Sequence, residues 1–299
     1  VHEIGDIKKG FTEANLVVER DFRTGPVHQG YIEPHSATAL WHPDGELTIW
    51  CSSQGHFGIR DMTAAILGIP QSKIKVVPME IGGGFGGKLG IYLEPVTALL
   101  SKKSGQPVKI TMSRADVFEG TGPTSGSFIR VKMGVTKKGK ITAAEGWIAY
   151  EAGAFPGSPI VSGTRCLLAP YDIPNARVEG FDVVVNKPKS AAYRAPGSPA
   201  AAFAAESVVD EIATMLDIDP IEFRIINGAK EGTRQIWGGK FPRIGYIETL
   251  EAAKSHEHYS TPLEGPWRGR GVASGYWMNA SGPACVHASV NADGTVNLV

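Results

Sequence analysis

Apolar and polar residues follow a strand-like and then a helical pattern early in the chain. Strand patterns cover 37–41 and 46–51, on either side of a turn at 42–45, and a third apolar run lies at 74–79. Between the second and third strands, residues from about 56 to 67 have the pattern of a helix. Together these segments predict a ββαβ unit.

Further along, the pattern predicts a longer hairpin and a long helix. The hairpin strands lie at 128–135 and 141–150. Ser198 and Pro199 form a good N-cap and first-turn pair for a helix that runs to about Leu216. A polar, proline-containing stretch at 255–266 is interpreted as a linker.

The last residues repeat an earlier pattern. Residues 284–299 follow the strand–turn–strand order of 36–50, with Ala-Asp-Gly in place of Pro-Asp-Gly. A true repeat predicts a further helix and strand, but the sequence ends within the second strand. Because an unpaired apolar strand is a poor terminus for a natural protein, we interpret the chain as a fragment of a longer one.

Composition narrows the class of protein. A chain that is 42% apolar, with 37 glycines and 20 prolines, indicates a compact, loop-rich globule. Thirty basic and thirty acidic residues balance, so no overall field favours nucleic acid or an anionic membrane, and no apolar stretch approaches membrane-spanning length. Three widely spaced cysteines suit neither a disulfide framework nor a zinc or iron–sulfur site, which favours a reducing, cytoplasmic location.

The richest local feature is the sequence GGGFGGK at 82–88, with five glycines in seven positions. It lies between the strand at 74–79 and apolar residues at helical spacing in 92–104. A loop with so few side chains brings backbone close to something, and its N–H groups suit an anion. A flexible surface turn is the simplest alternative.

A phosphate-binding P-loop is the sharper alternative. Gly82, Gly87 and Lys88 satisfy the G-x-x-x-x-G-K pattern, but Leu89 stands where a hydroxyl would hold magnesium. The apolar run at 181–185 ends at Asn186 rather than Asp, so a second magnesium ligand is also missing. These departures disfavour a nucleotide triphosphatase.

Four motifs in a fixed order carry a resemblance: Ser52–Gly55 before a helix, Gly82–Lys88, Tyr171–Asn175, and Ala192–Gly197 before a helix. In order and interval they resemble the molybdenum-binding subunit of the xanthine dehydrogenase and aldehyde oxidase family. The resemblance extends through essentially the whole chain. It implies a first molybdopterin-binding lobe at 1–254, a linker at 255–266 and the truncated start of a second lobe at 267–299.

The resemblance implies both a fold and a chemistry. The expected fold is an elongated α+β cofactor-binding lobe of repeated ββαβ-type units, with mixed sheets flanked by helices. The expected enzyme is a molybdenum hydroxylase that oxidises an aldehyde or an aromatic or N-heterocyclic carbon with water as the oxygen source. It implies molybdopterin, expected as the cytosine dinucleotide form, and iron–sulfur clusters and FAD on partner subunits or domains.

The same resemblance assigns roles to individual residues. Gln54 matches a glutamine whose amide hydrogen-bonds an oxygen on molybdenum, and Arg194 matches an arginine beside the metal; these are the expected catalytic residues. The expected cofactor-binding residues are Gln54, Gly83, Gly84, Phe85, Gly86 and Arg194. Phe85 is expected to act through its backbone, and no side chain is expected to ligate the metal directly. Taken alone, Gln54 would be an exposed helix-capping residue, Phe85 a hydrophobic plug and Arg194 a surface arginine.

Two departures from the family pattern bear on the expected substrate and on the expected activity of this chain alone. Purine-hydroxylating relatives have a glutamate after Gly-Gly-Lys, where this chain has Leu89, so we expect less polar substrates. The family's general base lies late in the second lobe, and Glu94, Glu206 and Glu211 are interpreted as solvated or structural. The fragment alone is therefore expected to be inactive and to bind no stable cofactor. A non-catalytic module whose glycine loop binds phosphate or a partner remains the alternative.

Overall fold

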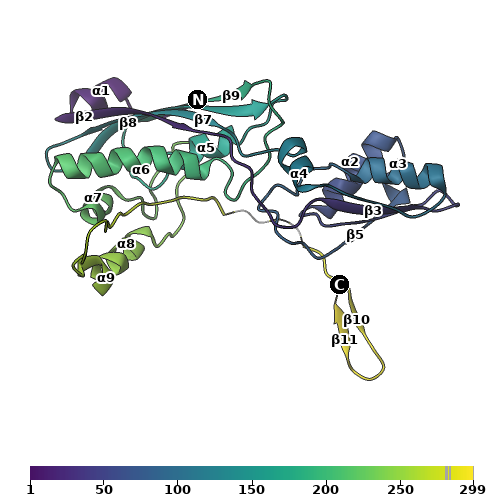
Figure 1. Cartoon of the computed structure of the whole chain (residues 1–299). Coiled ribbons are helices and arrows are strands. Elements are labelled where there is room, and N and C mark those ends of the chain that lie inside the picture. The colour runs from purple at the N-terminus through teal and green to yellow at the C-terminus, as the bar shows by residue number, and fades with distance from the viewer. Residues whose placement is uncertain (280–281, 283, 299) are drawn as a thin grey trace.

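The computed structural model describes residues 1–279, 282 and 284–298. Two sheets form two separate bodies joined by extended segments, and the molecule is elongated (Figure 1). The expected class, α+β with mixed sheets and flanking helices, is confirmed. The smaller sheet is built from residues that lie between two strands of the larger one, so each sheet of the expected first lobe has a hydrophobic core of its own.

The larger sheet has five strands in the order β1-β9-β8-β7-β2. Its strands are β1 (His2–Ile4), β2 (Leu16–Thr24), β7 (Ser127–Val135), β8 (Ile141–Gly153) and β9 (Ala176–Val184). The predicted hairpin is its centre, β7–β8, and β9 pairs parallel with β8. The N-terminal strands, which the sequence analysis missed, pair antiparallel with β9 and β7.

Helices cover this sheet because their apolar residues recur on one face. The helices of this body are α1 (Ile7–Thr12), α5 (Ile160–Cys166) and α6 (Ser198–Met215). Seven apolar residues of α6, all at most 1% exposed, belong to the core of this body: Ala201, Ala204, Ala205, Val208, Val209, Ile212 and Ala213. Their spacing of three or four residues makes the buried stripe of an amphipathic helix.

The smaller sheet contains the predicted ββαβ unit, which is confirmed. Its order is β5-β4-β3-β6, with β4 and β5 parallel. Its elements are β3 (Ser36–Trp41), β4 (Leu47–Cys51), α2 (His56–Leu67), β5 (Ile74–Pro78), α3 (Glu94–Ser104) and β6 (Val108–Thr111), followed by α4 (Arg114–Gly120). A short 3₁₀ turn at Gln71–Lys73 precedes β5. Helices α2 and α3 end in left-handed glycines, Gly68 and Gly105, whose lack of a Cβ makes that conformation inexpensive.

The C-terminal part begins with three helices: α7 (Pro220–Asn227), α8 (Tyr246–Ser255) and α9 (Glu257–Ser260). Helix α9 lies within the stretch interpreted as a linker. Beyond it, β10 (Ala288–Val290) and β11 (Val296–Leu298) form the predicted second hairpin, which extends away from both bodies (Figure 1). The predicted strand also included Val299, which lies outside the described residues.

The start of α6 differs from the prediction. Ser198 is the first residue of the helix rather than its N-cap, and the capping position is Gly197, whose φ is 83°. The Ser198 hydroxyl instead donates a 2.8 Å hydrogen bond to the carbonyl oxygen of Tyr276. A long-range contact therefore replaces the local capping bond that the sequence suggested.

Candidate functional site

The glycine-rich loop connects β5 to α3, which confirms its predicted strand–loop–helix setting. Three of its residues have positive φ: Gly83 (90°), Phe85 (53°) and Gly86 (102°). Phe85 lacks glycine's freedom there, so its backbone conformation is strained and is held by its surroundings. The Phe85 ring is 45% exposed, so it is not a hydrophobic plug beneath the loop.

Gln54, which follows β4, supports this loop from one side. Its Oε1 accepts hydrogen bonds from the backbone N–H groups of Gly86 (2.8 Å) and Lys88 (3.2 Å). A Cβ on Gly84 would lie 2.5 Å from the same oxygen. Two N–H donors fix the orientation of the amide, so its Nε2 group is turned away from them. That group has no acceptor within the described part of the chain.

The turn that carries Arg194 closes the loop from the other side. The Arg194 N–H donates to the carbonyl oxygen of Phe85 at 2.8 Å. A Cβ on Gly86 would lie 2.6 Å from the carbonyl oxygen of Ala192, so only glycine allows this approach. The structure thus brings together the three segments of Gln54, Phe85 and Arg194, as the sequence analysis expected.

The site has hydrogen-bond donors in excess of acceptors. The backbone N–H groups of Gly83, Gly84 and Phe85, the Gln54 Nε2 group and the Arg194 guanidinium have no protein acceptor among the residues described. Successive N–H groups in a left-handed turn form an anion-binding concavity. This donor set, with one fixed positive charge, fits a group rich in oxygen or sulfur acceptors, as a molybdenum–pterin centre is.

An ion pair between the buried Lys88 and the partly exposed Glu33 lies beneath the loop. The Lys88 side chain has no exposed surface, and its Nζ lies 2.7 Å from Glu33 Oε2 and 5.0 Å from the centre of the Tyr31 ring. The same carboxylate oxygen accepts the Gly82 N–H at 2.6 Å. Burial raises the pKa of Glu33, but the hydrogen bonds from Lys88 and Gly82 outweigh it and the net pKa is lowered. Because Lys88 is enclosed and paired, it is not available to a phosphate in the loop.

A layer of residues from the segment before β3 completes the support, and sequence reasoning missed it. Gln29 Nε2 donates to the Ala192 carbonyl at 2.8 Å, while its buried Oε1 has no partner within the part of the chain that the structure describes. The Tyr31 hydroxyl and His35 Nε2 are 2.8 Å apart. Burial lowers the pKa of His35 to about 4, so this histidine is neutral near pH 7. The signal available was a cluster of polar and aromatic residues at 28–35.

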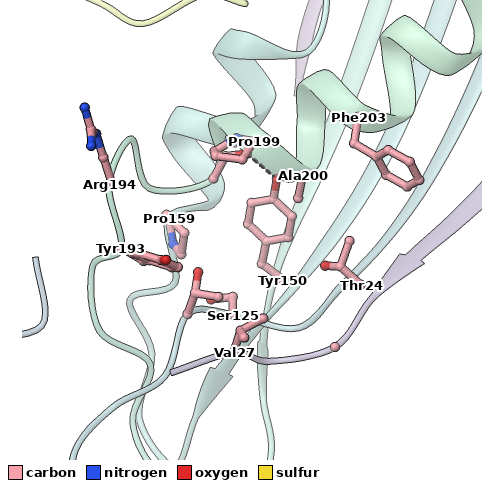
Figure 2. Close-up of a pocket in the computed structure, with 13 residues that line it drawn as sticks. Thr24, Val27, Ser125, Tyr150, Pro159, Tyr193, Arg194, Pro199, Ala200 and Phe203 are labelled. Carbon is pink, nitrogen blue, oxygen red and sulfur yellow. Dashed lines mark hydrogen bonds between the residues drawn. The ribbon is translucent and has the colours of Figure 1, made fainter. Parts of the chain in front are cut away.

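A cavity of about 620 Å³ lies beside the Arg194 turn (Figure 2). Tyr150, Pro159 and Phe203 give it a largely apolar lining, and the Tyr150 hydroxyl is held by the Gly197 carbonyl at 2.7 Å. The Arg194 side chain points away from this cavity (Figure 2). Arg194 is nevertheless among the residues that line the cavity.

Leu89 lines a second cavity, of about 310 Å³, together with Gly86, Tyr92 and Ala192. The leucine side chain is 46% exposed. This cavity therefore adjoins the glycine loop directly and presents an aliphatic side chain at the position after Gly-Gly-Lys.

The three glutamates interpreted as solvated or structural are structural. Glu94 is buried and accepts the Tyr92 N–H at 3.0 Å. Glu206 is buried against Arg224, and Glu211 forms an ion pair with Arg20 on the surface. Each carboxylate has a protein partner.

The described residues contain neither a metal-binding cluster nor a membrane-spanning helix. No group of three or more His, Cys, Asp or Glu side chains in 1–279, 282 and 284–298 is placed to hold a metal ion. No helix in those ranges is long and apolar enough to cross a membrane.

Comparison with known proteins defines the class. Residues 1–228 match the family model for the molybdopterin cofactor-binding domain. The chain therefore belongs to that family, and its relatives include molybdenum-binding subunits of an aldehyde oxidoreductase and of a xanthine dehydrogenase.

Individual relatives place it within the family. The chain is 32% identical to the nicotinate dehydrogenase large molybdopterin subunit of Eubacterium barkeri over 84% of its own length and 60% of that protein. It is 29% identical to the aldehyde oxidoreductase molybdenum-binding subunit of Escherichia coli K12, over 99% of the chain and 41% of the relative. The aldehyde oxidoreductase structure from Desulfovibrio desulfuricans superposes with a TM-score of 0.86 at 27% identity, over 99% of the chain and 34% of that structure. The chain thus spans less than two thirds of the length of each of these relatives.

Proposed function

We propose that this chain supplies one wall of the cofactor site of a molybdenum hydroxylase that oxidises an aldehyde or an aromatic or N-heterocyclic carbon, with water as the oxygen source. One observation carries the proposal. Gln54, the glycine loop and the Arg194 turn come from three distant segments and are joined by hydrogen bonds, from the Gly86 N–H to Gln54 Oε1 and from the Arg194 N–H to the Phe85 carbonyl. Membership of the molybdopterin-binding family supports it.

The cofactor we propose is molybdopterin, in its cytosine dinucleotide form. When bound, it would supply a redox metal that accepts two electrons. The chain's own residues bind and orient it: Gln54 donates through a neutral amide that does not titrate, Phe85 donates through its N–H, and Arg194 contributes a permanent charge. Helix α6 begins directly after the Arg194 turn, and its N-terminal end favours a pyrophosphate. Iron–sulfur and FAD subunits or domains would remove the electrons.

The substrate class rests on Leu89. A buried glutamate there would orient a purine through hydrogen bonds, whereas leucine offers neither charge nor acceptor. A lost hydrogen bond to a charged partner is worth about 1.5–3 kcal/mol, or roughly ten- to a hundred-fold in specificity. We therefore propose that the full-length enzyme prefers aldehydes or weakly polar aromatic and heteroaromatic compounds to xanthine and hypoxanthine. Steady-state assays decide this, and a kcat/KM for xanthine above that for every aldehyde and aromatic tested contradicts it.

Two substitutions of Gln54 separate its two roles. In Gln54→Glu a carboxylate oxygen still accepts the Gly86 and Lys88 N–H groups, but the outward donor becomes an acceptor. Gln54→Leu removes both the oxygen that accepts the loop N–H groups and the outward donor. We expect Gln54→Glu to keep the loop intact and to lower kcat on the order of a hundred-fold, as removal of one donor to a developing negative charge does. The proposal fails if Gln54→Glu turns over at the wild-type rate with full molybdenum content in the intact enzyme.

The phosphate-binding alternative is disfavoured by Lys88. A P-loop lysine reaches the phosphates from the loop, but here the ammonium is paired with Glu33 beneath it and has no exposed surface. Titration of the full-length protein with ATP or inorganic pyrophosphate tests the alternative directly. Tight, magnesium-dependent binding that Lys88→Met abolishes would favour it.

A further inference from the structure

An extended segment at 270–278, here named the strap, crosses the helices of the larger body without joining a sheet. Its even-numbered residues are partly buried, whereas the residues between them are exposed. Tyr276 and Met278 pack against the hydrophobic core of the larger body. The strap therefore lies on this body with the alternation of a strand but without a partner strand to define its path.

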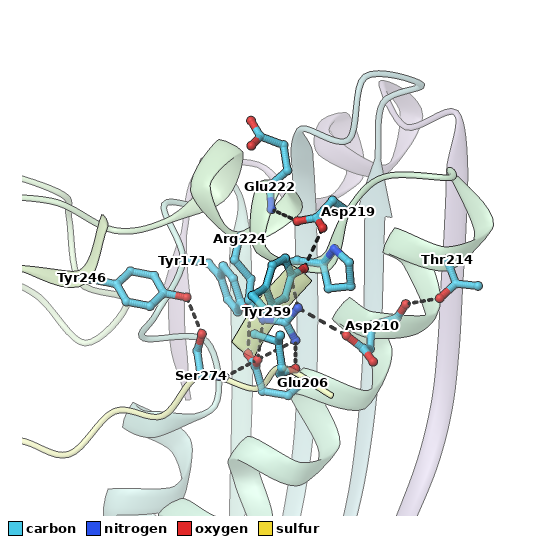
Figure 3. Close-up of polar contacts among 12 residues, drawn as sticks. Tyr171, Glu206, Asp210, Thr214, Asp219, Glu222, Arg224, Tyr246, Tyr259 and Ser274 are labelled. Carbon is cyan, nitrogen blue, oxygen red and sulfur yellow. Dashed lines mark hydrogen bonds and ion pairs between the residues drawn. The ribbon is translucent and has the colours of Figure 1, made fainter. Parts of the chain in front are cut away.

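Polar contacts fix the path of the strap, as pairing with a neighbouring strand would in a sheet. The Ser274 N–H donates to Glu206 Oε2 at 2.6 Å, and Arg224 Nη2 donates to the Val272 carbonyl at 2.8 Å. The Tyr246 hydroxyl and Ser274 Oγ are 2.6 Å apart. The strap is thus held through its backbone at two places by one charged pair (Figure 3).

That pair is fully enclosed. The side chains of Arg224 and Glu206 are 0% and 6% exposed, and Arg224 Nη2 lies 2.9 Å from Glu206 Oε2. Arg224 Nε donates to the same oxygen at 3.0 Å, and the Tyr171 hydroxyl donates to the other carboxylate oxygen. Both carboxylate oxygens of Glu206 thus accept hydrogen bonds, and the Arg224 guanidinium donates both to Glu206 and to the strap (Figure 3).

Stability alone does not explain such a pair. Replacing a buried ion pair by apolar residues of similar volume is often neutral or stabilising, because desolvation offsets the attraction between the charges. Helix α6 already buries seven apolar residues in the core of the larger body. What only the pair provides is a hydrogen-bonding partner for the backbone of Val272 and Ser274.

The strap also reaches the candidate site. The Ser198 hydroxyl donates to the Tyr276 carbonyl, and the Ser198 N–H donates to the Ala195 carbonyl at 3.0 Å. Ala195 has a φ of 58° and lies next to Arg194. A single residue therefore connects the strap to the strained turn that closes the glycine loop.

We propose that Glu206 and Arg224 are positioning residues that fix the path of the strap, and that Ser198 transmits this position to the Arg194 turn. The link to the turn concerns the proposed cofactor site, but the strap's attachment does not depend on the reaction. The test therefore measures backbone protection, which requires neither cofactor nor turnover.

The decisive variant combines Glu206→Leu with Arg224→Met in the full-length protein, so that no unpaired charge is left buried. Hydrogen exchange followed by mass spectrometry reports on the strap, on 193–197 and on β7–β8. We expect exchange in the strap to rise by about ten-fold or more, while β7–β8 is unchanged. Strap exchange within two-fold of wild type overturns the proposal.

A matched control and a second variant complete the test. Glu211→Gln changes a glutamate on the same helix whose ion pair with Arg20 does not touch the strap, and it should leave strap exchange unaltered. Ser198→Ala should raise exchange at 193–197, and Ser198→Thr, which keeps a hydroxyl, should restore it. If the double variant does not fold, Ser198→Ala and Tyr246→Phe decide the matter. Unchanged protection of the strap and of 193–197 in both contradicts the proposal.

The outcome is distinct from that for the proposed function. Molybdenum content and turnover of the full-length wild-type protein test the function, and a full-length protein without molybdenum would refute it. The exchange measurements would still show whether the pair fixes the strap.

Discussion

Two buried cations, each paired with a glutamate, support different regions of this molecule. Lys88 and Arg224 both have side chains with no exposed surface. Their partners differ, because the Glu33 side chain is 33% exposed and that of Glu206 only 6%. The lysine pair therefore retains contact with water on its acidic side, and the arginine pair does not.

The two cations also differ in how many segments they join. The Lys88 ammonium has one carboxylate partner, Glu33, which in turn fixes Gly82 in the same loop. The Arg224 guanidinium contacts Glu206, Asp210 and the Val272 carbonyl, which come from α6 and the strap. The Arg224 guanidinium, with five N–H donors in a planar fork, joins α6 to the strap, whereas the Lys88 ammonium donates to one carboxylate. We therefore expect the arginine pair to stabilise the whole larger body and the lysine pair to stabilise only the glycine-rich loop.

The largest effect should follow Arg224→Met. It leaves Glu206 buried with only the Tyr171 hydroxyl and the Ser274 N–H as partners. Breaking one side of a buried pair typically lowers the free energy of unfolding by about 3–5 kcal/mol. Urea denaturation of the full-length protein measures this. A loss below that of Lys88→Met would reverse the ranking of the two pairs.

Lys88→Met should have a smaller and more local effect. Glu33 keeps the Gly82 N–H and its access to water, so the loss is that of one hydrogen bond between charged groups, about 1.5–3 kcal/mol. Lys103→Met, on the exposed end of α3, is the matched control and should be near neutral. We also expect faster hydrogen exchange in 82–88 but not in the strap. Equal loosening of both regions would show that the two pairs are not independent.

The region around Lys88 should also respond to pH through His35. Burial, followed by the nearby Lys88 charge, lowers the pKa of His35 from 6.5 to about 4. At a pH between about 4 and 6.5, His35 is therefore protonated in the unfolded chain but neutral in the folded chain. Stability is complete above pH 6.5 and falls as the pH drops toward 4, by up to about 1.4 kcal/mol per pH unit. His35→Gln should flatten this part of the stability profile, and an unaltered slope would mean that His35 does not titrate in this way.

The sequence predicted those parts of the fold whose pattern is local. The strands at 37–41 and 46–51, the helix at 56–67 and both hairpins are visible in alternation and turn residues, and the structure confirms them. The sequence did not show that the residues of the smaller sheet lie between two paired strands of the larger sheet. These strands, β2 and β7, are separated by about a hundred residues. Local patterns do not encode which distant strands pair.

The candidate site shows the same division. The glycine loop, Gln54 and Arg194 were predicted as site residues because glycine density and ordered motifs mark them. Glu33 and Gln29 were missed, because a single polar residue gives no signal until the fold places it beneath a loop. Ser198 was assigned a local capping role from its position, whereas the structure uses it for a contact 78 residues away.

The smallest predicted effect separates the two carboxylates that contact Arg224. Asp210 Oδ1 lies 3.3 Å from Arg224 Nη1, and its side chain is 47% exposed. An exposed carboxylate gains little from an ion pair, because water screens the attraction and solvates the charge when it is free. Asp210→Asn should therefore lower the free energy of unfolding by less than about 1 kcal/mol and leave strap exchange unchanged. If it destabilised the protein as much as Arg224→Met does, burial of Glu206 would not be what distinguishes the arginine pair from the lysine pair.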